Sequence, residues 1–176
     1  MTLKLSFYKA DKQDAEPLTS LINSAYRGEA SRAGWTTEAD LLDGRRTDVD
    51  GVLKLIAEDD SMFIVCKADS ELQGSIHLRN TEDGVHIGMF AVNPALQGCG
   101  IGKALLQAAE LAAQKTWSAN RFVMVVISCR HELIAFYERR GYHYTGVNKA
   151  FPLNPSVWTP KVSDLALVIL EKTLLF

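Results

Sequence analysis

Residues 92–102 read VNPALQGCGIG, and they carry more structural information than any other part of the chain. The segment follows the apolar run Val85–Val92, which predicts a β-strand, and it leads into Ile101–Lys115, where apolar residues recur on one helical face. Its glycines stand at alternate positions and leave backbone N–H groups open to a ligand oxygen, because few Cβ atoms are in the way. The first helical turn adds unpaired N–H groups and the positive end of the helix dipole. Together these features predict a phosphate-binding site.

Two common phosphate-binding motifs do not fit this segment. A dinucleotide fingerprint reads G-x-G-x-x-G after the first strand, with an acidic residue about 20 residues further on. Here the order is G-x-G-x-G near the middle of the chain, and no suitable acid closes the next strand. A nucleoside-triphosphate loop fails as well, because Ala104 stands where a hydroxyl would hold magnesium. The remaining interpretation is a pyrophosphate held mainly by main-chain N–H groups, with no metal.

The same residues resemble a known family. Gln97–Gly102 is similar to the acetyl-CoA signature [QR]-x-x-G-x-[GA] of the GNAT superfamily of N-acyltransferases. Further along, Ala135–Tyr142 resembles the F-Y-x-x-x-G-F segment that follows the next strand in that family. Two motifs in the family's order, on either side of a predicted strand, make the resemblance specific. It extends over essentially the whole chain.

Apolar periodicity predicts a single α/β domain over residues 1–176, without repeats or low-complexity linkers. The resemblance implies a mixed, mostly antiparallel sheet of about seven strands with a parallel, splayed central pair, flanked by about four helices. In the family, the wedge between the splayed strands receives the pantetheine arm of the cofactor. The predicted strands cover residues 3–7, 62–67, 72–79, 85–92, 122–127, 142–146 and 165–173, and the predicted helices cover 11–26, 36–45, 101–115 and 132–140.

Composition is that of an ordinary globular protein and excludes several classes of function. The chain has 176 residues, 47% of them hydrophobic, and a net charge of -2, which gives no general attraction to nucleic acid or to an anionic membrane. Residues 1–10 lack the apolar block of a signal peptide, and no apolar run is long enough to cross a bilayer. The three cysteines cannot all pair, so we expect reduced thiols and a cytoplasmic protein.

The resemblance implies acetyl-CoA as the cofactor, with no metal. The main chain of Phe90, Ala91 and Val92 would pair with the pantetheine amides as an added strand does, with Phe136 nearby. Many family members carry an asparagine seven residues before the motif tyrosine, where this chain has Arg130, which could reach a phosphate or a carboxylate instead. The residues expected to hold the pyrophosphate are Gln97, Gly98, Cys99, Gly100, Ile101, Gly102 and Lys103.

Tyr137 occupies the position of the family's usual general acid. Its phenol could lie one hydrogen bond from the sulfur of the thioester and donate a proton to the departing thiolate. The structural alternative is a core aromatic residue, because Phe136 and Tyr137 adjoin on a helix that must pack on the sheet. No covalent enzyme intermediate is needed, since the thioester is already activated.

His86 stands where several relatives keep a glutamate that acts as general base. A histidine with a near-neutral pKa could accept the proton of the ammonium directly or through water. Strand alternation places His86, Gly88, Phe90 and Val92 on one face, provided that no bulge intervenes. The alternative is a half-exposed strand histidine with no role in proton transfer. Two carboxylates near the expected acceptor side, Glu29 and Glu38, are further candidates for the base.

Acceptor sites in this family are built by the first two helices, their connection and the loop before the last strand. In those segments, Tyr26 and Trp35 could form an apolar or cation–π wall, and Arg32 could hold a substrate carboxylate, with Glu29 beside it. Simple packing is the alternative for the tryptophan. This mixed character favours a small primary amine, amino-acid-like or polyamine-like.

Two other classes of function stay open on the sequence. One is a regulatory module that binds CoA without catalysing transfer. The other is an acyltransferase that uses a longer acyl donor, an oxygen acceptor, or the N-terminus or a lysine of a protein. Homodimers are common in the family, although no segment of this chain marks an interface.

Overall fold

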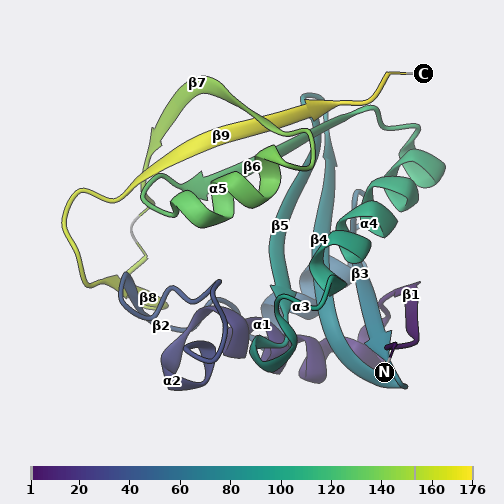
Figure 1. Ribbon diagram of the computed structural model, residues 1–176, viewed down its shortest axis with the longest axis horizontal. Coiled ribbons are helices and arrows are strands. Elements are labelled where there is room, and N and C mark those ends of the chain that lie inside the picture. The colour runs from purple at the N-terminus through teal and green to yellow at the C-terminus, as the bar shows by residue number, and fades with distance from the viewer. Residues whose placement is uncertain (1, 153, 176) are drawn as a thin grey trace.

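The computed structural model describes residues 2–152 and 154–175 of the chain. Seven strands form one mixed sheet in the order β1-β3-β4-β5-β6-β9-β7 (Figure 1). All neighbours in this sheet run antiparallel except β5 and β6, which run parallel. The strands are β1 (Leu5–Lys9), β3 (Ser61–Ala68), β4 (Glu71–Thr81), β5 (Gly84–Val92), β6 (Arg121–Ile127), β7 (His143–Ala150) and β9 (Ala166–Thr173). The predicted mixed sheet with one parallel pair is therefore confirmed.

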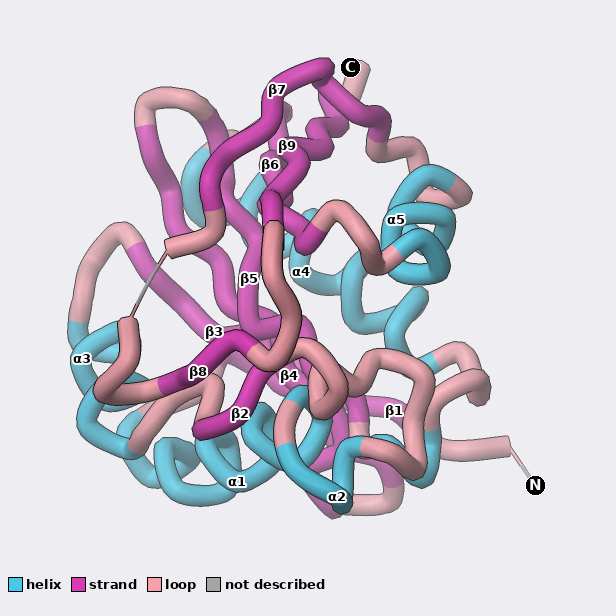
Figure 2. The backbone as a smooth tube through the Cα atoms, turned by 90° about the vertical axis from the view of Figure 1, so that its left-hand side faces the viewer, coloured by secondary structure: helices cyan, strands magenta, loops and turns pink. Residues whose placement is uncertain are grey.

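Five α-helices accompany the sheet, and two short strands pair outside it. Figure 2 shows these two strands, β2 (Leu42–Gly44) and β8 (Trp158–Pro160), side by side in an antiparallel pair. The helices are α1 (Ala15–Tyr26), α2 (Gly28–Ser31), α3 (Val49–Ala57), α4 (Ile101–Trp117) and α5 (His131–Glu138). None of the helices in the described residues is long and apolar enough to cross a membrane.

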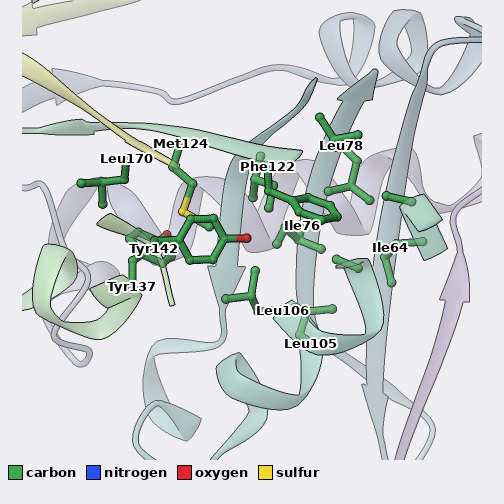
Figure 3. Close-up of a cluster of buried hydrophobic side chains, with 14 of the residues drawn as sticks. Ile64, Ile76, Leu78, Leu105, Leu106, Phe122, Met124, Tyr137, Tyr142 and Leu170 are labelled. Atoms are coloured by element: carbon green, nitrogen blue, oxygen red, sulfur yellow. The ribbon is translucent and has the colours of Figure 1, made fainter. Parts of the chain in front are cut away.

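Each face of the sheet carries its own hydrophobic core. On one face, α4 and α5 cover a cluster in which Tyr142 packs among Leu106, Met124, Tyr137 and Leu170 (Figure 3). On the other face, α1 and α3 cover a second cluster that belongs mainly to the N-terminal half of the sheet. Burying one such large apolar side chain stabilises the fold by about 1.5–3 kcal/mol, so both layers hold the central strands firmly.

The parallel pair β5 and β6 separates after three residue pairs. Val85–Ile87 pair with Phe122–Met124, and beyond this point β5 stays with β4 while β6 stays with β9. In Figure 1, β6, β9 and β7 swing away from β3, β4 and β5. The predicted splay of the central strands is thus confirmed. From residue 88 onward, the edge of β5 that faces β6 has no described strand beside it, while its other edge pairs with β4.

A β-bulge in β5 corrects one expectation from the sequence. The register between β4 and β5 shifts at Met89, whose φ is +44°. Ile87 and Val92 both lie in the core on the α4 face although five positions separate them, because the bulge inserts an extra residue. Phe90 packs against the same core. His86, one position before Ile87, therefore points to the opposite face from Phe90 and Val92, and the predicted shared face is wrong.

The helix predicted over residues 36–45 is absent, and turns followed by β2 occupy this stretch. In this stretch the hydroxyl of Thr37 lies 2.5 Å from that of Ser31 and accepts the N–H of Ala39 at 3.1 Å, and the hydroxyl of Thr36 accepts from Gln97. The next helix, α3, begins instead after Asp48, whose carboxylate accepts the N–H of Gly51 at 2.8 Å. The start of α3 is thus set by the local cap at Asp48, whereas the segment before it is held in a non-helical conformation by contacts such as that of Thr36 with Gln97.

Candidate active site

Two cavities open where β5 and β6 diverge, and they share one wall. The first, here called the glycine cavity, has a volume of about 330 Å³ and lies at the N-terminus of α4. The second, here called the arginine cavity, has a volume of about 250 Å³ and lies between α1, β6 and the β7–β8 loop. Residues on the shared wall are Tyr26, Phe90, Leu133 and Tyr137.

The glycine cavity takes its floor from the turn that precedes α4. Gly98 has a φ of +86° and Gly100 a φ of +87°, a conformation that L side chains rarely adopt. A Cβ at either position would meet no described atom within 4 Å, so the space above the turn is open to a ligand. The first turn of α4 has no acidic residue to offset its positive end. This turn has the properties of an anion-binding cradle.

Cations and aromatic rings complete the glycine cavity. Lys103, Arg139 and Arg140 line it, and the guanidinium of Arg140 lies 3.5 Å from the centre of the Phe136 ring. Burial and the neighbouring Arg139 lower the pKa of Arg140. The two arginines were not singled out from the sequence, although they lie inside the second motif. Trp35, predicted to contact the acceptor, packs on Phe136 with ring centres 5.7 Å apart and lines the glycine cavity but not the arginine cavity.

Gln97 fastens a distant loop to the end of β5. Its amide nitrogen donates to the hydroxyl of Thr36 at 2.7 Å and to the carbonyl of Val92 at 3.1 Å, and its oxygen accepts the Thr36 N–H at 3.2 Å. A Cβ on Gly34 would lie 2.3 Å from the Gln97 oxygen, so the loop approaches this side chain closely. Because both ends of the Gln97 side-chain amide already bond within the chain, only its backbone is available for the predicted contact with a pyrophosphate.

Tyr137 stands on the shared wall with its hydroxyl free. The side chain is buried, and the ring centres of Phe90 and Tyr142 lie 6.2 Å and 6.0 Å from its own. The hydroxyl makes no hydrogen bond to any described residue, whereas that of Tyr142 donates to Glu110 at 2.8 Å. Burial raises the pKa of Tyr137, with Tyr26 adding to the effect. The phenol therefore stays protonated at neutral pH and faces both cavities as a hydrogen-bond donor.

Tyr26 joins α1 to the bulged part of β5. Its hydroxyl donates to the carbonyl of Phe90, and burial, together with the nearby Glu38, raises the pKa of Tyr26 to about 12. The guanidinium carbon of Arg130 lies 6.0 Å from the centre of its ring. The cation over the ring of Tyr26 in the structure is therefore a residue of this chain, Arg130.

A buried ion-pair network lines the arginine cavity. Glu38 accepts from Arg27 at 3.2 Å and from Arg130 at 3.0 Å, and all three side chains are at most 9% exposed. Arg130 also donates to the carbonyl of Thr36. Predicted as a cofactor contact, Arg130 lines only the arginine cavity, where the carboxylate that it reaches is that of Glu38. Burial lowers the pKa of Arg27.

Several predicted site residues lie outside both cavities. His86 lines neither, and burial and the nearby Lys149 lower its pKa. Glu29 and Arg32 pair with each other at 3.0 Å on the surface, and neither lines a cavity. The side chains of Ala91 and Ile101 are buried in the two cores, and Cys99 is exposed. Ala91 and Ile101 could therefore serve a ligand only through their backbone.

Comparison with known proteins agrees with the motifs. A model of the acetyltransferase (GNAT) family matches residues 17–142, which is well over half of the chain. The chain belongs to the GNAT acetyltransferase family. Among curated proteins, none matches its sequence significantly. Within the described residues, no group of three or more His, Cys, Asp or Glu side chains is placed to hold a metal ion.

Solved acetyltransferases share the GNAT fold of this chain at low sequence identity. The ribosomal-protein-S18-alanine N-acetyltransferase of Escherichia coli matches with a TM-score of 0.72 at 11% identity, over 98% of this chain and 96% of that one. PaiA N-acetyltransferase of Thermoplasma acidophilum, solved in complex with coenzyme A, matches with a TM-score of 0.68 at 20% identity, over 97% and 99%. A protein described as a phosphinothricin N-acetyltransferase matches with a TM-score of 0.70 at 14% identity, over 98% and 100%.

Proposed function

We propose that this protein is an acetyl-CoA-dependent N-acetyltransferase that acetylates the primary amine of a small molecule. The observation that carries the proposal is the place of Tyr137, whose unpaired hydroxyl faces a cavity suited to a phosphorylated cofactor and a second cavity suited to a small acceptor. Membership of the GNAT family supports the acetyl donor. The second cavity is smaller than the roughly 300–1,000 Å³ of sites for drug-sized ligands, which favours a small acceptor over a protein segment.

The glycine cavity fits coenzyme A in its chemistry. Backbone N–H groups from Gly98 to Gly102 and the side chains of Lys103, Arg139 and Arg140 would hold the pyrophosphate. The free edge of β5 after Gly88 would pair with the pantetheine amides. Two carbonyls in this part of β5 already accept hydrogen bonds from the chain itself, that of Phe90 from Tyr26 and that of Val92 from Gln97. When bound, acetyl-CoA supplies the activated thioester.

In the proposed reaction, the acetyl group would pass to the neutral amine: a C–N bond forms, the C–S bond breaks, the nitrogen loses a proton and the departing thiolate gains one from solvent. Tyr137 donates a hydrogen bond to the sulfur, which stabilises the negative charge that develops as the bond breaks. Its raised pKa keeps this donor protonated over the neutral range. The buried aromatic rings around Tyr137 would keep water from the sulfur of a bound thioester and so strengthen this interaction.

The proton of the amine leaves without a dedicated side-chain base in this arrangement. Glu38 is the one carboxylate among the described residues that line the arginine cavity, and both of its oxygens already bond arginines. His86 lies outside both cavities. We therefore assign proton removal to water in the arginine cavity, in place of the predicted histidine.

The proposal is tested by incubating the protein with acetyl-CoA and a panel of small amines while measuring free thiol. Release of thiol that depends on the amine, with the acetylated product identified by mass spectrometry, supports the proposal. Acetyl-CoA without amine is the control for hydrolysis. Calorimetric binding of CoA with no turnover of any amine would contradict it and would favour a regulatory CoA-binding module.

A further inference from the structure

The arginine cavity holds an excess of positive charge. Three guanidinium groups line it, those of Arg27, Arg46 and Arg130, against the single carboxylate of Glu38. Both oxygens of that carboxylate are already used, one by Arg27 and the other by Arg130. The internal pairing therefore leaves one guanidinium, that of Arg46, without a counter-ion.

The backbone of Arg46 is anchored while its side chain is free. Its N–H donates to the side-chain oxygen of Asn23 at 2.8 Å, and the N–H of Thr47 donates to the same atom at 3.1 Å. The half-buried guanidinium makes no ion pair or hydrogen bond with any described residue, yet it lines the cavity. Arg45, one position earlier, is exposed, pairs with Asp48 at 3.3 Å and lies outside the cavity.

Much of the rest of the lining is apolar. Met89 in the bulge, Ile127 at the end of β6, and Phe151 and Trp158 from the segment before β9 face the same space. The ring nitrogen of Trp158 donates to the carbonyl of Pro152 at 3.3 Å, which fixes this side of the cavity. A ligand that fills the cavity therefore meets the hydroxyl of Tyr137 on the shared wall, apolar side chains and one unpaired cation.

We infer that the acceptor is a small amine that carries a carboxylate, bound by Arg46, and a large apolar side chain, as in an α-amino acid such as phenylalanine, leucine or methionine. This inference rests on the proposed N-acetyltransferase function and names the acceptor class. A guanidinium and a carboxylate form a charge-assisted, frequently bidentate pair, which orients the amine relative to the shared wall.

The same charges work against polyamines, the other acceptor class that the sequence suggested. A second ammonium group would lie among three guanidinium groups, and like charges in a cavity of low polarity repel strongly. The excess positive charge also favours the neutral form of the reacting amine, because a nearby cation lowers the pKa of an ammonium group. The arginines thus account for the lack of a dedicated base.

The test compares matched acceptors on matched variants. L-Phenylalanine and 2-phenylethylamine share the ring and the amine and differ in the carboxylate, and spermidine represents the polyamines. We expect kcat/KM of the wild-type protein to be at least tenfold higher for phenylalanine than for either other amine. Arg46→Gln is expected to lower kcat/KM for phenylalanine by about 10- to 100-fold, the range for losing a charged hydrogen bond, and to lower that for phenylethylamine to a much smaller extent. Arg45→Gln is the matched control and should change neither.

Two results would overturn the inference while leaving the N-acetyltransferase function intact. One is a wild-type preference for phenylethylamine or spermidine, and the other is an equal loss for both aromatic amines in Arg46→Gln. If no amine is turned over, the proposed function fails. Calorimetry of phenylalanine binding then tests separately whether Arg46 holds a carboxylate in the arginine cavity. Phenylalanine should bind to the CoA-saturated wild-type protein and not to Arg46→Gln, and equal or absent binding in the two proteins would contradict the carboxylate site.

Discussion

The glycine and arginine cavities share a wall but are built in opposite ways. The glycine cavity depends on the backbone of one continuous segment, Gln97–Lys103, supported by the motif on α5. The arginine cavity is assembled from side chains of α1, the β2 region, β5, β6, α5 and the β7–β8 segment, which are far apart in sequence. A backbone cradle can bind the same cofactor throughout a family, while a wall of side chains can change its ligand one residue at a time.

The largest effect is expected from Gly100→Glu in the backbone cradle. The substitution strains a φ of +87° and places a carboxylate where the pyrophosphate would lie, so CoA binding measured by calorimetry should be abolished. Gly146→Glu is a matched control, because Gly146 has a φ of +85°, equally open space and no place in either cavity. Wild-type affinity in Gly100→Glu would show that the cradle does not bind the cofactor.

Tyr137→Phe probes the wall that the two cavities share. Loss of the hydroxyl should lower kcat by about 100-fold, at the lower end for loss of an acid–base group, with little change in the affinity for CoA. Tyr142→Phe is the control, because that hydroxyl bonds Glu110 in the core and should affect unfolding more than turnover. Full activity in Tyr137→Phe would remove the phenol from the mechanism.

The pH dependence of the free energy of unfolding tests the sheet that supports the two cavities, independently of the cavities themselves. His77 lies on β4 outside both cavities, its Nε2 lies 2.7 Å from the hydroxyl of Ser61, and burial lowers its pKa from 6.5 to about 4. Between these two pH values the unfolded chain binds the proton and the folded protein does not, so stability falls as the pH falls. The free energy of unfolding should drop by about 2 kcal/mol from pH 7 to pH 5.

Chemical denaturation at the two pH values measures this effect of His77. The variant His77→Gln should lose most of the dependence, whereas His143→Gln, at an exposed histidine, should keep it. An unchanged pH dependence in His77→Gln would mean that another group titrates.

The smallest effect is expected from Gln97→Ala, which tests whether the motif glutamine acts through its side chain. Its loss releases the loop at Thr36 but keeps the backbone cradle, so the affinity for CoA should fall by about 3- to 10-fold, the range for one or two neutral hydrogen bonds. Thr36→Val should have a similar effect, because it removes the hydroxyl that accepts the hydrogen bond from Gln97. A loss as large as that of Gly100→Glu would mean that the side chain itself binds the phosphate.

The sequence predicted the glycine cavity well because its determinants are local. A strand, a glycine turn and a helix N-terminus are contiguous, and their chemistry follows from the backbone alone. The second motif placed Tyr137 on the correct helix for the same reason. The splayed parallel pair was also predicted, although through the family resemblance and not through periodicity.

The arginine cavity was predicted poorly because its determinants are tertiary. Arg46 lies in a loop without any local pattern, and only the fold brings it beside Arg130. The bulge at Met89 turned His86 away, and a bulge leaves no clear mark on the apolar pattern of β5. Trp35 lies in the glycine cavity because Gln97 bonds the neighbouring Thr36 and so places this loop over Phe136.

The position of β9 has a consequence for synthesis on the ribosome. β9 is the last strand in chain order, yet it lies between β6 and β7, and β7 pairs with no other strand of the described residues. During translation at about 5–20 residues per second, the segment that carries Tyr137 emerges before the strand that completes its half of the sheet. Until β9 emerges, the edges of β6 and β7 that pair with it in the folded protein therefore lack this partner.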